Sequence, residues 1–185
     1  MRAIVKMLVL GVACLGLGAC ETLLEPTAAP PHSLASLPGN WQVGASEMHD
    51  SKGRAFAVCT LLRTGEGDRR FWIAGTRPDV STDLYIGVRA PDLPKAAGTA
   101  ERHALIAIDG REFRPTRTQH VGTDLSMAIP AGGRDAFLDA FAKGGNLSVT
   151  VDEVPGFMMA VGLNGSANGR REWRNCLDTE LAKAS

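Results

Sequence analysis

The feature that most constrains the fold of this chain is an alternation of apolar and polar side chains with a period of two. It is cleanest at residues 84–89, 124–129 and 147–152, where every second residue is a Leu, Ile, Val or Met. A less regular alternation recurs at 41–45, 55–63, 70–75, 103–109 and 157–163. A period of two places alternate side chains on opposite faces of a β-strand. The pattern therefore predicts about eight half-buried strands.

Two segments have helical periodicity instead. Residues 134–143 place Phe137, Leu138 and Phe141 on one side of a helix that stops at two glycines. Residues 168–182 place Trp173 and Cys176 on one apolar stripe, with most of the charged side chains off it. Both segments therefore predict short helices among the strands.

Turn signals separate the expected strands and define the fold class. Glycines at 65 and 67, the hairpin dipeptide Asp109-Gly110 and the pair Pro155-Gly156 each lie between two alternating segments. Strands joined by short turns pair in antiparallel fashion. We expect a mainly β fold with two short helices, an antiparallel sandwich or open barrel, and a C-terminal helix packed on the sheet.

The N-terminus has the layout of a secretory signal peptide. Arg2 and Lys6 precede an uncharged apolar run at residues 7–17, which is shorter than the roughly 20 residues that a membrane-spanning helix needs. The sequence Leu-Gly-Ala-Cys at 17–20 resembles the lipobox of bacterial lipoproteins, in which the cysteine is acylated. An ordinary cleavage site that happens to precede a cysteine is the alternative. The resemblance implies lipidation of Cys20 and anchoring to a membrane through its acyl chains.

The lipobox divides the chain into three parts. Residues 1–19 are the expected signal peptide, 20–40 an acylated cysteine followed by a proline-rich tether, and 41–185 a single β-rich domain. Removal of the leader leaves 166 residues, which suits one domain with a core of its own. By analogy with enteric bacteria, Glu21 in place of aspartate after Cys20 favours the outer membrane. The expected location is the cell envelope, on its periplasmic face or at the surface.

Cysteine usage agrees with export. Of four cysteines, Cys14 leaves with the leader and Cys20 is acylated, so Cys59 and Cys176 remain. Two thiols in an oxidising compartment predict one disulfide. Two unpaired buried thiols are the alternative, and a catalytic cysteine is disfavoured because neither residue has a neighbouring histidine.

Motifs for other chemistry are mostly missing from the sequence. The four histidines are scattered, the Glu47–Asp50 segment is better explained as a solvated turn than as a metal site, and Ser166 is better explained as a helix cap than as a nucleophile. With the leader removed the net charge is near −2 and no basic stripe is present, which argues against nucleic acid. We expect no cofactor, no metal and no enzymatic activity.

Residues 129–177 carry a further resemblance. The sequences IPAGGRDAFLDAFAKGGNLSVTV and FMMAVGLNGSANGRREWRNC resemble the closing part of exported alphaproteobacterial proteins of the invasion-associated locus B family. The resemblance implies a β-rich periplasmic or surface protein without established catalytic residues. The lipobox is a departure from that family.

Together these features predict a lipid-anchored accessory or binding protein of the cell envelope, with an envelope protein as its partner. An inhibitor of an exported enzyme and an envelope hydrolase with a dispersed site are the alternatives. Arg170, Arg171 and Arg174 are the candidate binding residues, because arginines form bidentate bonds to carboxylates and phosphates. A solvated helix face is the simpler explanation of that cluster, and the loop at 64–69 is the next candidate surface.

Overall fold

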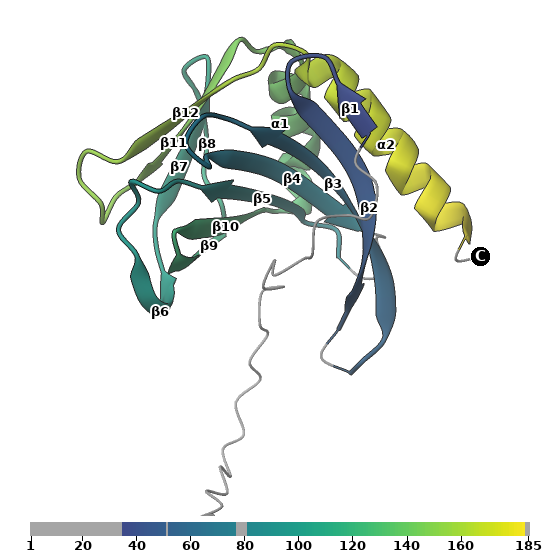
Figure 1. The fold of residues 1–185 in the computed structure, drawn as a ribbon, viewed down its shortest axis with the longest axis horizontal. Helices are drawn as coiled ribbons and strands as arrows, with labels where there is room; N and C mark the ends of the chain where they lie inside the picture. The colour runs from purple at the N-terminus through teal and green to yellow at the C-terminus, as the bar shows by residue number, and fades with distance from the viewer. Residues whose placement is uncertain (1–34, 51, 77–80, 184–185) are drawn as a thin grey trace, which may run out of the picture.

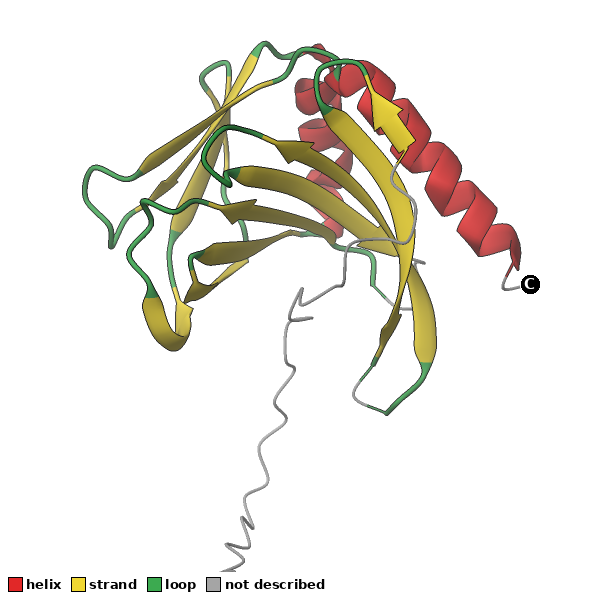
Figure 2. Cartoon of the chain, in the orientation of Figure 1, coloured by secondary structure: helices red, strands yellow, loops and turns green. Residues whose placement is uncertain are grey.

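The computed structural model describes residues 35–50, 52–76 and 81–183 of the chain. In this part of the chain twelve strands and two helices form two antiparallel sheets with helices packed against one side (Figures 1 and 2). The sheets do not close into a barrel, so of the two expected architectures the sandwich is confirmed. No helix in these ranges is both long and apolar enough to cross a membrane.

The large sheet has eight strands in the order β1-β2-β3-β4-β5-β10-β9-β6. All of its strand pairs are antiparallel. Its members are β1 (Ala35–Leu37), β2 (Trp41–His49), β3 (Ala55–Thr64), β4 (Arg70–Thr76), β5 (Leu84–Arg89), β6 (Ala96–Glu101), β9 (Arg117–Gly122) and β10 (Asp124–Ile129).

The small sheet has four strands in the order β12-β11-β7-β8. Its members are β7 (Ala104–Ile108), β8 (Arg111–Phe113), β11 (Asn146–Val151) and β12 (Met158–Gly162). In Figure 1 helix α1 (Ala131–Lys143) lies behind the large sheet, and helix α2 (Ser166–Lys183) runs at the right beside β1 and β2. One face of the large sheet is therefore covered by the helices and the small sheet.

The core lies between that covered face and α1. Phe137 and Phe141 of α1 are both fully buried. The Phe141 ring packs edge-on against Trp41 at 5.3 Å between centroids and stacks on Phe71 at 6.1 Å, while Phe137 meets Phe113 of the small sheet at 5.2 Å. The helical stripe of aromatic residues therefore joins the two sheets through side-chain packing.

The alternation in the sequence sorts side chains onto the two faces as expected. Leu84, Ile86 and Val88 are all buried in the core, whereas Tyr85 and Arg89 between them are partly exposed. All eight expected strands are present. Four additional strands, β1, β6, β8 and β9, were not predicted.

The first described strand begins at Ala35, before the expected domain boundary at Trp41. Strand β1 pairs with β2, and the turn between them rests on the turn before α2. The indole nitrogen of Trp41 donates to the Asn164 carbonyl at 2.8 Å. Gly39 has a positive φ of 80°, and a Cβ there would lie 2.1 Å from the same carbonyl oxygen, so only glycine fits. Part of the segment assigned to the tether is thus an edge strand.

Two details of the helices differ from expectation. Helix α1 begins at Ala131, so the two glycines at 132 and 133 belong to its first turn rather than to a preceding loop. Ser166 is buried at the start of α2, where its hydroxyl donates to the Phe141 carbonyl at 2.7 Å. The expected helix-capping role of Ser166 is therefore replaced by a hydrogen bond that ties α2 to α1.

Candidate functional site

Among the described residues, no helix or strand covers one face of the large sheet. We call this the outer face and define it by the side chains that alternate with the core residues on six central strands; it faces the viewer in Figure 1. Most of them are partly exposed. The outer face consists of Gln42, Gly44, Thr60, Leu62, Trp72, Ala74, Tyr85, Gly87, Ser126, Ala128, Arg117 and Gln119.

Strand register arranges these side chains in rows that run across the strands. One row follows the pairings of Gln42 with Leu62, Leu62 with Trp72, Trp72 with Gly87, Gly87 with Ser126 and Ser126 with Gln119. Side chains at directly paired positions lie on the same side of a sheet and within contact distance of their neighbours. The row therefore forms one continuous strip from β2 to β9.

Trp72 is the largest side chain on this strip. Its indole lies across the backbone of Gly87, because a Cβ built on Gly87 would come within 1.8 to 2.4 Å of three indole atoms. Glycine at 87 thus lets the aromatic ring settle onto the sheet, as glycines do where another group approaches the backbone closely. Trp72 is partly exposed, whereas Trp41 and Trp173 are 0% and 1% exposed. The indole of Trp72 therefore presents aromatic surface to solvent.

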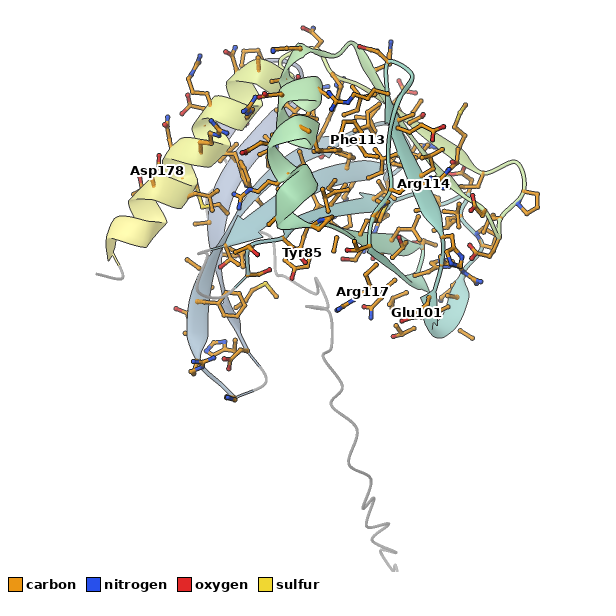
Figure 3. The ribbon with its side chains drawn as sticks, turned by 180° about the vertical axis from the view of Figure 1, so that it is seen from behind. Tyr85, Glu101, Phe113, Arg114, Arg117 and Asp178 are labelled. Carbon is orange, nitrogen blue, oxygen red and sulfur yellow. A yellow bond between two sulfur atoms is a disulfide. The ribbon has the colours of Figure 1, made fainter. Side chains whose placement is uncertain are left out.

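The adjacent row carries Tyr85 and Arg117 on either side of Ala128. Ala128 is 2% exposed but lies outside the core cluster, so its neighbours on the outer face cover it. The Tyr85 hydroxyl lies 3.1 Å from Ser81 Oγ. Figure 3 shows the side chains of Tyr85 and Arg117 at the same end of the large sheet, away from Asp178 on α2.

Ionic groups at one end of the outer face neutralise one another. Arg89 forms two hydrogen bonds of 2.7 Å with the carboxylate of Asp124, and Arg70 contacts Asp68 at 2.6 Å. The hydrogen bonds to Asp124 raise the pKa of Arg89 above its ordinary value. The charged side chains that border the strip are therefore already paired with groups of opposite charge.

The β2–β3 hairpin extends beyond the rest of the sheet (Figure 1). Its turn is fixed by Asp50, whose carboxylate accepts from the backbone of Lys52 at 2.8 Å and from the backbone and side chain of Arg54 at 2.9 and 2.6 Å. These bonds, that from the Arg54 backbone most of all, lower the pKa of Asp50. Met48 and Phe56 are paired just below the turn and are partly exposed. The described polar residues of the turn are therefore joined by hydrogen bonds, next to an apolar pair of side chains.

The disulfide predicted between Cys59 and Cys176 is confirmed. It joins β3 to α2 with 6.0 Å between the α-carbons. Next to it the indole nitrogen of Trp173 donates to the Cys59 carbonyl at 2.8 Å, and the ring fills the space above Gly75, where a Cβ would lie 2.6 Å from Trp173. Helix α2 is thus held on the covered face of the sheet.

The three candidate arginines of α2 do not converge. Arg170 contacts Asp139 of α1 at 2.6 Å, its side chain is only 16% exposed, and this contact lowers the pKa of Asp139. Arg171 contacts Glu172 at 3.3 Å, and Arg174 is exposed. The geometry favours a solvated, partly neutralised helix face over a single anion site.

The remaining predicted positions are spread over the molecule. The loop at 64–69 joins β3 to β4, where Arg69 contacts Asp92 at 2.8 Å. Glu47 and His49 lie at the end of β2 with 3.7 Å between Oε1 and Nε2. Within the described ranges no three His, Cys, Asp or Glu side chains come together as metal ligands. Cys20 and the predicted signal peptide lie outside the described residues.

One buried polar group was not anticipated. His120 on β9 is 1% exposed, between Leu125 and Ala100, and neither ring nitrogen has a hydrogen bond to the described residues. Burial lowers the pKa of His120, as does the nearby charge of Arg102, whereas Asp124 and the backbone carbonyls of Gly122 and Pro94 oppose that shift. The imidazole is therefore held neutral in the core.

The aromatic side chains of the outer face were also missed. Trp72 and Tyr85 occupy outward positions in their strands, between the buried pairs Phe71 and Ile73 and Leu84 and Ile86. An aromatic residue at an outward position of an alternating segment is the signal that would have identified them, because such positions are normally polar.

Comparisons with known proteins complete the description. No protein-family model and no curated protein matches the sequence. A solved structure, that of invasion associated protein B from Bartonella henselae, is similar with a TM-score of 0.47 and 14% identity, over 77% of this chain and 96% of that chain. Its name is that of the family which residues 129–177 resemble.

Proposed function

We propose that this protein is a lipid-anchored binding protein of the bacterial cell envelope, that it acts without catalysis, and that its outer face contacts the partner. The single observation that carries the proposal is a sheet face that no described helix or strand covers, with Trp72 and Tyr85 partly exposed on it. Exposed aromatic side chains on a rigid scaffold are typical of recognition surfaces. The disulfide between Cys59 and Cys176 supports an oxidising compartment.

The tether explains how such a domain would reach its partner. Between Cys20 and the start of β1 at Ala35 the chain has a proline-rich sequence. At roughly 3.3–3.6 Å per extended residue, this stretch spans up to about 50 Å. Acyl chains on Cys20 would therefore hold the domain at the membrane while its outer face stays accessible. Glu21 favours the outer membrane as the site of attachment.

The anchor is tested by fractionation and labelling. Wild-type protein should partition into detergent and incorporate a fatty-acid label, and Cys20→Ala should lose both properties. The disulfide provides a matched control, since Cys176→Ala should change stability but not partitioning. Wild-type protein recovered unlabelled in the soluble fraction would refute the anchor.

The binding surface is tested by photo-crosslinking in living cells. A photoreactive amino acid at Thr60, which lies on the outer face between Gly44 and Ala74, should yield adducts with an envelope component. The same amino acid at Asp178, exposed on α2, serves as the control and should yield none. Adducts at Asp178 without adducts at Thr60 would assign binding to the helix side instead.

The projecting β2–β3 hairpin favours a second candidate function, inhibition of an exported enzyme. A turn whose described polar residues are joined by hydrogen bonds, next to the apolar pair of Met48 and Phe56, has the form of a segment that enters another protein's cleft. A photoreactive amino acid at Ala55 should then capture an enzyme, and Phe56→Ala should weaken its inhibition. Adducts confined to Thr60 would exclude this candidate.

A further inference from the structure

The partly exposed indole of Trp72 is the best candidate on the outer face for a stacking platform. The ring is supported from below by the backbone of Gly87, which has no side chain to lift it off the sheet. A supported ring loses little conformational freedom when a ligand lies on it, so the cost of ordering the site is small. The platform fits a flat ligand with polarised C–H bonds, because the face of an aromatic ring is electron-rich.

Neutral hydrogen-bonding groups continue the row beyond the platform. After Gly87 the row passes to the hydroxyl of Ser126 and then to the carboxamide of Gln119, and both side chains are partly exposed. Hydroxyl and carboxamide groups each donate and accept hydrogen bonds. With strands about 4.8 Å apart, the distance from β4 to β9 across three strand spacings is about 14 Å. A short chain of hydroxyl-bearing rings matches both the length and the alternating donors and acceptors of this row.

The charges along this row favour a ligand without strong charge. The row itself holds no ionisable side chain, and at its border Arg89 is matched by Asp124 and Arg70 by Asp68. The exposed side chain of Arg117 lies outside the row, in the adjacent one. A charged ligand would lose hydration without gaining a free counter-charge in the row. A row of neutral side chains therefore favours an uncharged ligand.

From these observations we infer that the outer face binds a neutral oligosaccharide, with one sugar ring stacked on Trp72 and its hydroxyl groups bonded to Ser126 and Gln119. The inference deepens the proposed function, on which it rests, by naming the ligand class of the outer face. Sugars present both a face of C–H groups and a rim of hydroxyl groups, which is the combination that this row offers.

Tryptophan fluorescence gives a direct test with the full chain purified in detergent. Of the three tryptophans, Trp41 and Trp173 are buried, so a ligand in solution reaches only Trp72. Chitotetraose and maltotetraose are the neutral probes, and tetragalacturonate is the anionic control. At least one neutral probe should change the emission and protect it from acrylamide quenching, with saturation at millimolar concentrations or below. Tetragalacturonate should bind at least about tenfold more weakly.

Calorimetry with variants locates the site. Trp72→Ala should weaken binding of the neutral probe at least about tenfold, and Gln119→Ala should weaken it severalfold. Met158→Ala is the matched control, because Met158 is 59% exposed on the other sheet and should leave affinity unchanged. If Trp72→Ala fails to fold, Gln119→Ala and the amide chemical shifts of Ser126 in wild-type protein test the same contact.

Three results would overturn the inference. They are the absence of a response to both neutral probes, unchanged affinity in Trp72→Ala together with Gln119→Ala, and binding of tetragalacturonate as tight as that of the neutral probes. Protein adducts from Thr60 combined with no sugar binding would remove the oligosaccharide and leave the proposed function standing. Wild-type protein without a fatty-acid label would refute the lipid anchor without changing the outcome of the sugar titration.

Discussion

The disulfide offers the prediction whose magnitude follows most directly from the structure. Cys59 and Cys176 are separated by 117 residues, and the chain-entropy relation for a loop of this length gives about 4.9 kcal/mol of stabilisation at 25 °C. Folding free energies of single domains are about 5–15 kcal/mol. The double substitution Cys59→Ala with Cys176→Ala should therefore remove a large share of the total stability.

Urea unfolding followed by tryptophan emission measures this loss. The oxidised wild type should unfold at a higher urea concentration than both the double alanine variant and the wild type treated with reductant. Oxidised protein should also show the smaller dependence of free energy on urea, because the crosslink keeps its unfolded state more compact. Replacing Cys59 by serine instead of alanine should cost about 1–3 kcal/mol more, since Cys59 is 1% exposed and a buried hydroxyl there needs a partner.

A second variant separates the covalent bond from the packing beside it. Trp173→Phe removes the 2.8 Å hydrogen bond to the Cys59 carbonyl but leaves the disulfide in place, and should cost about 1–2 kcal/mol. Equal unfolding midpoints for oxidised and reduced wild type would refute the entropic argument. A loss in Trp173→Phe as large as that in the double alanine variant would show that helix docking, and not the crosslink, supplies the stability.

Three further predictions test other parts of the fold. Burial lowers the pKa of His120, so the unfolded state takes up the proton first and the free energy of unfolding should fall as pH drops below about 6.5. His120→Leu should flatten this dependence in urea titrations at pH 7.5 and 5. An equal change of unfolding free energy with pH in both proteins would contradict it. Gly75→Ala should lower the melting temperature and cost about 1–3 kcal/mol, because its Cβ would lie 2.6 Å from Trp173; an unchanged midpoint would mean that the ring moves freely. Asp109→Ala should cost about 1–2 kcal/mol in thermal unfolding, because its carboxylate accepts from the backbone of Gly145 and Asn146 at 2.8 and 2.9 Å, and Asp109→Asn should recover part of that loss.

The class of the fold follows from local patterns in the sequence. Alternation along a strand is a local property, so the burial of Leu84, Ile86 and Val88 was predictable without knowing what covers them. The hairpin at Asp109-Gly110 was predictable for the same reason, because both residues have a positive φ that this dipeptide adopts readily. The disulfide was predictable by count, since only two cysteines remain once those of the predicted leader and the predicted lipobox are set aside.

Strands that break the apolar pattern were missed for a physical reason. In β9 the inward positions are Thr118 and His120, which are 4% and 1% exposed although both are polar. In β6 the residues from Ala96 to Glu101 include no large apolar side chain. Both strands lie at one edge of the large sheet, where pairing with a neighbour determines the conformation more than side-chain hydrophobicity does.

The position of a candidate recognition surface depends on contacts between distant segments and could not be predicted from local pattern. The arginines of α2 form a cluster in the sequence, yet Arg170 is directed to Asp139 while Arg174 is exposed to solvent. On the outer face the reverse holds: Trp72, Ser126 and Gln119 are far apart in the sequence but share one row of the large sheet. The strand order and register of the sheet place them there. Alternation fixes which face of a strand a side chain occupies, but its neighbours across the sheet depend on contacts between distant segments.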